Sequence, residues 1–318
     1  MSSPTTTPRR RHVLDLDDWS ADELRTLLTI ATQMKDVLER PVKQVPTLRG
    51  KIVVNMFWED STRTRSSFEL AAKALSANVL SLGAKDTSVK KGESLVDTVR
   101  TVQALGADYI VMRHGQSGSP YLVAQHFRGS VINGGDGRHA HPSQALLDLF
   151  TMHERLGELA DKKVVIVGDI LHSRVARSNL WALTTMGAKV VVCGPPTLIG
   201  PAKYWQSTWP KVEISHSLDQ AAAGADVLMA LRLQHERMEG GLLPSLREYS
   251  RRFGLNATRV ASANSNVIVM HPGPMNEGVE IMPDVATGPH SVIETQITNG
   301  VAMRMALFYY LATGSEQV

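Results

Sequence analysis

The chain has 318 residues, of which 43% are hydrophobic and 20% charged, and its formal net charge is +3. This length predicts about two domains, and this composition excludes disordered, collagen-like and low-complexity proteins. The longest apolar runs are only as long as strands, so we expect no membrane-spanning segment. A single cysteine, Cys193, excludes an internal disulfide framework, and its apolar setting predicts an inert core thiol.

Basic residues are spread along the chain, which disfavours a nucleic-acid-binding surface. No apolar segment follows the basic run at 9–11, so we expect no secretory signal and a cytoplasmic location. The spread of cations is still suited to a protein that binds small anions.

Strands and helices alternate through the first half of the chain. Beyond a polar N-terminal stretch, the apolar spacing predicts a helix within 18–40, strand 51–58, helix 62–77, strand 78–82, helix 94–106, strand 107–113, helix 120–127 and strand 130–133. This alternation is typical of a parallel sheet covered by helices.

A long helix at 141–156 precedes a second series of the same kind. It comprises strand 163–168, helix 173–186, strand 189–193, helix 218–223, strand 226–233, helix 246–253, strand 266–270 and a final helix at 292–312. The sequence therefore predicts two doubly wound parallel-sheet α/β domains. We place them at 1–150 and 151–291, with the final helix packed back on the first domain and the active site in the cleft between domains.

The first polar cluster, STRTR at 61–65, follows the first predicted strand and opens a helix. Hydroxyls and an arginine at a helix N-terminus form a cradle for an oxyanion, although the P-loop pattern is absent. The alternative is an ordinary serine cap with a solvated basic turn. Arg63 and Arg65 are two residues apart and cannot share one helix face, so we expect one to bind ligand and the other to pair with Glu59 or Glu69.

Three further residues in the first half are candidates for chemistry. Arg113 ends an apolar strand and can bind phosphate with both nitrogens, the alternative being a structural ion pair. His141 begins a helix, with Gln144 one turn later, and can donate to an acyl oxygen, the alternative being a structural histidine. A metal site at Asp136, His139 and His141 is disfavoured because no convincing further ligand follows.

The second half opens with VVIVGDILHSR, which has only Gly168 of the dinucleotide-binding glycines. A dinucleotide site is therefore disfavoured. Arg174 follows a predicted strand, Arg232 lies at the end of the strand predicted at 226–233, and Gln234 accompanies Arg232. Two guanidinium groups suit a dicarboxylate ligand, because each can bind one carboxylate.

Together these segments resemble the aspartate/ornithine carbamoyltransferase family. The resemblance is carried by FWEDSTRTRSSFE at 57–69, MRH at 112–114 and HPSQALLDLFT at 141–151. Within the family, KKGES at 90–94, RLQHER at 232–237 and HPGP at 271–274 are similar to the members that act on aspartate. The HCLP and DxWxSMG-like segments of the ornithine-specific members are absent.

The resemblance implies a role for each matched residue. Ser61, Thr62, Arg63 and Thr64 would bind the phosphate of carbamoyl phosphate. Arg113, His141 and Gln144 would bind its phosphate and carbamoyl groups, helped by the backbone of Gly273 and Pro274. Aspartate would be held by Lys91, Arg174, Arg232 and Gln234. Ser88 and Lys91 would come from the adjacent subunit, and the direct participants in catalysis would be Arg63, Thr64, Arg113, His141 and Lys91.

The implied reaction transfers the carbamoyl group of carbamoyl phosphate to the α-amine of L-aspartate, as in de novo pyrimidine biosynthesis, with no metal or cofactor. The implied assembly is a homotrimer with shared active sites, which regulatory chains or a dihydroorotase could join. The sequence departs from the family pattern at two places. At 271–274 it has HPGP where many members have HPLP followed by an arginine, so that Gly273 replaces a leucine. The loop with Ser88 is one residue shorter. The alternatives are an ornithine-specific transferase and a non-catalytic anion-binding subunit.

Overall fold

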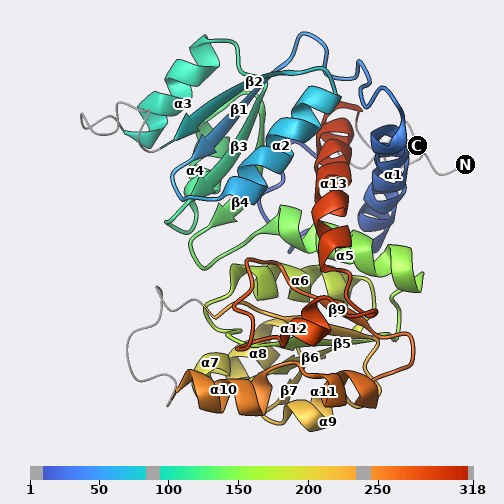
Figure 1. The fold of residues 1–318 in the computed structure, drawn as a ribbon. Coiled ribbons are helices and arrows are strands. Elements are labelled where there is room, and N and C mark those ends of the chain that lie inside the picture. Colours follow the sequence, from blue (N-terminus) through green and yellow to red (C-terminus); the bar gives the residue numbers. More distant parts are fainter. Residues whose placement is uncertain (1–9, 84–93, 234–244, 314–318) are drawn as a thin grey trace, which may run out of the picture. The chain divides into compact units, whose positions relative to one another are not determined.

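The computed structural model describes residues 10–83, 94–233 and 245–313. Packing divides the chain into two compact units (Figure 1). The first unit comprises Met1–Asp15, Asp22–Gly137 and Val301–Val318, and the second comprises Leu16–Ala21 and Arg138–Gly300. The domain boundary near residue 150 stays a prediction, but this division assigns His141 and Gln144 to the second unit.

The first unit is built on a four-stranded parallel sheet in the order β2-β1-β3-β4. Its strands are β1 (Ile52–Phe57), β2 (Asn78–Gly83), β3 (Tyr109–His114) and β4 (Ser130–Asp136), and its helices include α1 (Ala21–Glu39), α2 (Thr62–Ala74), α3 (Leu95–Ala104) and α4 (Ser119–His126). One face packs on α3 and α4 through a cluster that includes Val54, Val99 and Val123. On β3, Tyr109 meets Phe308 of α13 (Ile293–Thr313) edge to face, and Phe308 also contacts Phe68 of α2.

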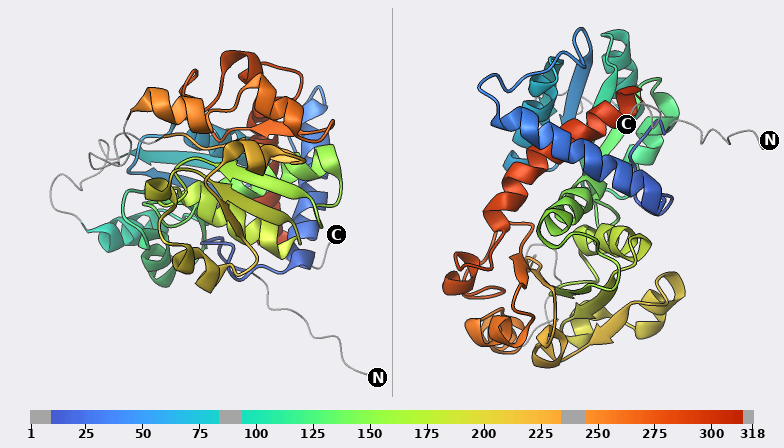
Figure 2. Two further views of the ribbon diagram at one scale, coloured as in Figure 1. Left: turned by 90° about the horizontal axis from the view of Figure 1, so that it is seen from below. Right: turned by 90° about the vertical axis from the view of Figure 1, so that its right-hand side faces the viewer.

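The second unit is built on a five-stranded parallel sheet in the order β7-β6-β5-β8-β9. Its strands are β5 (Lys163–Val167), β6 (Lys189–Cys193), β7 (Glu213–Ser215), β8 (Val227–Ala230) and β9 (Ile268–Met270). Its helices include α5 (Pro142–Leu156), α6 (Arg174–Thr185), α7 (Pro196–Ile199), α8 (Ala202–Thr208), α9 (Leu218–Ala222), α10 (Leu246–Phe253), α11 (Ala257–Ser262) and α12 (Pro283–Ala286). Figure 2 shows both sheets from two further directions.

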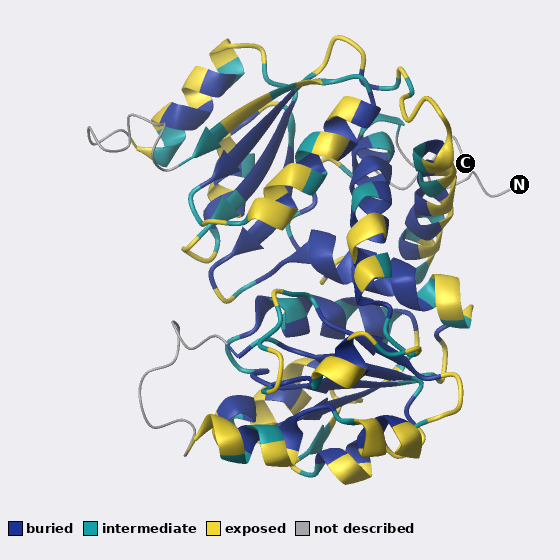
Figure 3. Ribbon diagram, in the orientation of Figure 1, coloured by how far each residue is buried: buried dark blue, intermediate teal, exposed yellow. Residues whose placement is uncertain are grey.

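Both sheets have buried central strands, as expected for parallel sheets covered by helices (Figure 3). Their near-continuous apolar sequences, such as KVVIV in β5, follow from burial on both faces. The predicted fold class is thereby confirmed. The sequence patterns missed β7, α7, α8, α11 and α12, because elements of three to seven residues are too short to show a period.

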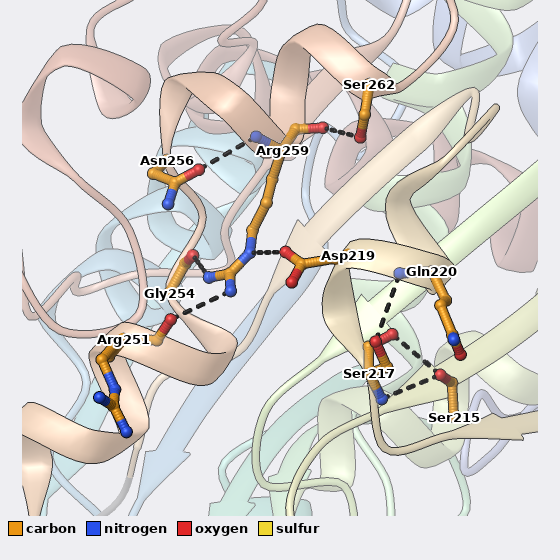
Figure 4. A network of polar contacts seen from close by, with 9 residues as sticks. All are labelled: Ser215, Ser217, Asp219, Gln220, Arg251, Gly254, Asn256, Arg259 and Ser262. Atoms are coloured by element: carbon orange, nitrogen blue, oxygen red, sulfur yellow. Dashed lines mark hydrogen bonds and ion pairs between the residues drawn. The ribbon is translucent and has the colours of Figure 1, made fainter.

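Buried Arg259 fastens the helices on one side of the second sheet (Figure 4). Its Nε donates to Asp219 of α9 at 2.7 Å, and its Nη atoms donate to the Arg251 and Gly254 carbonyls at the end of α10. These carbonyls lack partners within their own helix, so the guanidinium satisfies them and complements the negative end of the helix dipole. Arg259 is therefore structural and separate from the arginines predicted to bind ligand.

Cys193 ends β6 and is buried. Burial raises the pKa of its thiol to about 12, so the thiol stays protonated at neutral pH. Within the described ranges, no helix has both the length and the apolar character needed to cross a membrane.

Candidate active site

The N-terminus of α2 follows the end of β1 in the first unit. Ser61 is the N-cap in an extended conformation, and no capping hydrogen bond from its side chain is formed within the described chain. The first turn contains no acidic residue. The backbone N–H groups of Thr62, Arg63 and Thr64 therefore stand at the positive end of a 13-residue helix, where an oxyanion is favoured.

Arg113 lies beside this helix start, because β3 pairs with β1 and places Arg113 opposite Phe57. The Trp58 N–H donates to the Arg113 carbonyl at 2.9 Å. The Arg113 Nη1 donates to the Gly134 carbonyl at 3.3 Å, and its Nε lies 3.7 Å from Glu59 Oε2. The structure thus brings Arg113 together with Ser61–Thr64 in one part of the first unit, and it pairs Glu59 with Arg113. The other predicted partner, Glu69, bonds Lys73 at 2.7 Å.

His114 supports the turn after β3. Its Nδ1 accepts the Gln116 N–H at 2.9 Å, which places the proton of the neutral ring on Nε2. Burial lowers the pKa of His114, with Glu59 and Asp136 acting in the opposite direction. This histidine is therefore neutral at physiological pH and serves the turn that follows Arg113.

His141 and Gln144 lie at the start of α5 in the second unit. His141 is 4% exposed and occupies the N-cap position, where its backbone N–H donates to Ser178 Oγ of α6 at 2.9 Å. Gln144 is 9% exposed, and its Nε2 donates to Asp148 Oδ1 at 3.0 Å. Ser178 of α6 thus anchors the His141 backbone, and Asp148 holds the Gln144 side chain.

The HPGP turn follows β9. The Nδ1 of His271 accepts the Gly273 N–H at 2.7 Å, and its Nε2 lies 3.3 Å from Glu280 Oε1. Glu280 Oε1 also accepts the Asn276 N–H at 2.7 Å. The peptide bond between Gly273 and Pro274 is cis, and Gly273 has a φ of 61°, which glycine adopts without strain. Two buried side chains therefore hold the turn that carries Gly273 and Pro274.

Arg174 opens α6, the helix that follows β5, and Arg232 comes shortly after β8. The strands β5 and β8 are neighbours in the second sheet. Arg174 is 4% exposed at the first turn of α6, after Asp169 and His172, whose Oδ1 and Nδ1 are 2.9 Å apart. Burial raises the pKa of Asp169, and the interaction with His172 acts in the opposite direction. Gly168, with a φ of 139°, allows this close packing, since a Cβ there would lie 3.0 Å from Leu231 Cβ.

Four residues with supporting roles were missed from the sequence: Asp148, His172, Glu280 and Gln296, whose Oε1 accepts the His271 N–H at 3.0 Å. Asp148 stands inside the HPSQALLD segment, so its position could have indicated a role. Gln296 and Glu280 carry no local signal, because their contacts depend on the fold. Ser88, Lys91 and Gln234 lie outside the described residues. Within the described chain, no group of three or more histidine, cysteine or acidic side chains is arranged to hold a metal.

Two family models match the chain in succession. The carbamoyl-phosphate-binding domain of aspartate/ornithine carbamoyltransferase matches residues 11–154, and the aspartate/ornithine-binding domain matches residues 160–311. An aspartate carbamoyltransferase catalytic subunit of Chloroflexus aurantiacus is 67% identical over 306 residues, covering 96% of this chain and 99% of that protein. One from Roseiflexus sp. is 68% identical over 304 residues, covering 96% of each.

Solved structures agree with this relationship. Aspartate transcarbamoylase of Trypanosoma cruzi, in complex with carbamoyl phosphate and aspartate, aligns with a TM-score of 0.85 at 28% identity, covering 95% of this chain and 96% of that chain. Ornithine carbamoyltransferase of Pyrococcus furiosus aligns with a TM-score of 0.84 at 31% identity, covering 94% and 96%. The family predicted from the motifs is confirmed, and the chain belongs to the aspartate/ornithine carbamoyltransferase family.

Proposed function

We propose that this chain transfers the carbamoyl group of carbamoyl phosphate to the α-amine of L-aspartate, giving N-carbamoyl-L-aspartate and phosphate. The observation that carries the proposal is the 66–68% identity to aspartate carbamoyltransferase catalytic subunits over almost the whole chain. The fold alone does not select the acceptor, because an ornithine enzyme aligns about as well as an aspartate enzyme.

Binding of the phosphate group is assigned to residues of the first unit. The α2 N-terminus with Ser61, Thr62, Arg63 and Thr64 binds the phosphate, and Arg113 adds a second cation whose orientation is set by Gly134 and Glu59. Departure of phosphate needs no covalent help from the protein. Stabilisation of the negative charge on the leaving group by N–H dipoles and guanidinium groups lowers the barrier directly.

The carbamoyl group is assigned to His141, Gln144 and the turn with Gly273 and Pro274. A histidine N–H that donates to the carbonyl oxygen binds more strongly as the attacking amine makes this oxygen negative. The Gln144 oxygen and the turn carbonyls are acceptors for the carbamoyl NH2 group. These groups orient the carbonyl carbon, and orientation of two reactants can supply about 7–11 kcal/mol in favourable cases.

The acceptor is assigned as aspartate on charge. Arg174 and Arg232 follow adjacent strands, and each guanidinium can bind one carboxylate of the substrate. Gln234 would add an amide contact. Ornithine carries a second ammonium group, which would be repelled by the same cations, so this alternative is disfavoured.

The proposal includes a homotrimer in which Ser88 and Lys91 of one subunit complete the site of the next. It also includes a cytoplasmic location and a place in de novo pyrimidine biosynthesis. Support for these finer points comes from the KKGES and HPGP segments, which are similar to the aspartate-specific members.

The proposed reaction is tested by product identification. The full chain should convert 13C-labelled carbamoyl phosphate and L-aspartate into labelled N-carbamoyl-L-aspartate, with one phosphate released per product, as measured by mass spectrometry and a phosphate assay. Phosphate release without a carbamoylated amino acid would indicate hydrolysis and contradict the proposal.

Replacement of His141 by alanine should lower kcat about a hundredfold or more and raise KM for carbamoyl phosphate much less. The reason is that the donor to the carbonyl oxygen contributes mainly in the transition state. Steady-state kinetics with a His153→Ala control would measure this effect, because His153 lies near the other end of α5. An effect confined to KM would make His141 a ground-state contact.

A further inference from the structure

The buried carboxylate of Asp148 accepts hydrogen bonds from three side-chain amides within the second unit. It has no exposed surface. Its Oδ1 accepts hydrogen bonds from Gln144 Nε2 at 3.0 Å and Gln296 Nε2 at 2.8 Å, and its Oδ2 accepts one from Asn179 Nδ2 at 3.0 Å. These partners come from α5, α13 and α6, so a single side chain joins three helices.

The carboxylate determines which way the Gln144 amide faces. Asp148 accepts hydrogen bonds from Gln144, Gln296 and Asn179, so the NH2 end of Gln144 faces Asp148. The oxygen end must then face the opposite way. This Oε1 accepts no hydrogen bond from any residue that the structure describes, although Gln144 is only 9% exposed. Gln144 is thereby held with an acceptor ready for a donor that none of the described residues supplies.

Gln296 connects Asp148 to the HPGP turn. While its Nε2 donates to Asp148, its Oε1 accepts the backbone N–H of His271 at 3.0 Å. His271 in turn holds Gly273 through the 2.7 Å bond from the Gly273 N–H to its Nδ1. The orientation of the Gln296 amide is therefore fixed by a hydrogen bond at each end. Two successive hydrogen bonds link Asp148 to His271, and a third links His271 to Gly273.

We propose that Asp148 is a positioning residue that makes the site selective for a carbamoyl group over an acyl group of the same shape. It does so by presenting the Gln144 oxygen and the Gly273–Pro274 turn as acceptors for an NH2 group. The inference rests on the proposed function. Acetyl phosphate differs from carbamoyl phosphate by a methyl group in place of this NH2 group, and a site built to accept hydrogen bonds discriminates against the analogue that cannot donate them.

The replacement Asp148→Asn tests the inference at nearly constant volume. An asparagine offers one neutral acceptor oxygen in place of the two oxygens of a carboxylate. The Gln144 donor therefore either meets an NH2 group or loses a charge-assisted hydrogen bond, and in both cases its amide is held less firmly. In the full chain, binding of carbamoyl phosphate should weaken about tenfold or more. Binding of acetyl phosphate and of inorganic phosphate should stay within about twofold, because neither has an NH2 group that depends on Gln144. Competitive inhibition and initial-rate kinetics measure all three.

Asn299→Leu is the matched control. Asn299 also joins α13 to α5, through Thr151 at 3.1 Å and Glu154 at 3.0 Å, but it does not bond Gln144, His271 or Asp148. Its loss should lower thermal stability and leave the ratio of carbamoyl phosphate to acetyl phosphate affinity unchanged. If the Asp148 variant does not fold, Gln296→Met carries the test, since it breaks the link to His271 and should lower the same ratio.

The results that overturn the inference are specific. Equal weakening of all three ligands by Asp148→Asn would show a general structural role, and so would an equal loss of the ratio in Asn299→Leu. An unchanged ratio in both Asp148→Asn and Gln296→Met would exclude positioning. A wild-type chain that carbamoylates no amino acid would instead overturn the proposed function, and with it the inference.

Discussion

Arg63→Ala should lower carbamoyl transfer about a thousandfold, because it removes a cation from the helix N-terminus that is assigned to the departing phosphate. The backbone N–H groups of α2 remain in the variant, so the fold and the unassisted oxyanion cradle should persist. Initial rates at saturating aspartate, together with inhibition by inorganic phosphate, measure the loss. We expect the affinity for phosphate to fall along with kcat.

Arg65→Ala is the control for this change. Arg65 is exposed on the same helix, two positions further on, and the two arginines project in different directions. We expect this variant to keep most of its activity. A large loss of activity in Arg65→Ala with little loss in Arg63→Ala would assign phosphate binding to Arg65. Unchanged phosphate affinity in both variants would show that the α2 N-terminus does not bind the phosphate.

Lys91→Ala should be nearly inactive on its own, yet it should regain activity when mixed with Arg63→Ala. The proposed trimer places Lys91 of one subunit in the site of the next, where its flexible ammonium group binds both anionic substrates. A mixed trimer therefore contains a site with an intact Arg63 and an intact neighbouring Lys91. In a cyclic trimer each mixed assembly holds one such site, so random equal mixing should restore about a quarter of wild-type activity.

The measurement requires reversible dissociation, remixing and confirmation of mixed trimers by native mass spectrometry. Each variant dissociated and reassociated alone is the control, and it should stay inactive. No recovery in confirmed mixed trimers would place Lys91 in the site of its own chain or outside the site. Monomers, or assemblies that are not built from trimers, would contradict the shared-site geometry before any rate was measured.

Much of the fold follows from the sequence because the central strands are buried on both faces. KVVIV in β5 and KVVVC in β6 are continuous apolar runs that alternate with helical patterns, which is enough to predict parallel sheets. β7 has only three residues, and α12 has four, so neither shows a periodic pattern. The strand predicted at 226–233 is shorter in the structure, where β8 is Val227–Ala230.

In the candidate site too, some residues could be predicted from the sequence and others could not. The positions of Arg63, Arg113, Arg174 and Arg232 after strands could be predicted, because polar residues that follow the strands of a parallel sheet gather at one edge of that sheet. Their roles in binding stay predictions. The residues that hold the site residues in place could not be predicted. Gln296 bonds Asp148 across 148 positions of sequence, and Glu280 matters only because His271 and Asn276 fold toward it. Such contacts exist only once the tertiary structure brings distant segments together.

The choice of acceptor is the central claim, and a comparison of amino acids tests it most directly. The full chain should be assayed with carbamoyl phosphate and, in turn, L-aspartate, L-glutamate, L-asparagine and L-ornithine at equal concentrations. With Arg174 and Arg232 binding the two carboxylates, kcat/KM for L-aspartate should exceed that for each of the others by about a hundredfold or more. Faster carbamoylation of L-ornithine, or of an amino acid without a second carboxylate, would contradict the account.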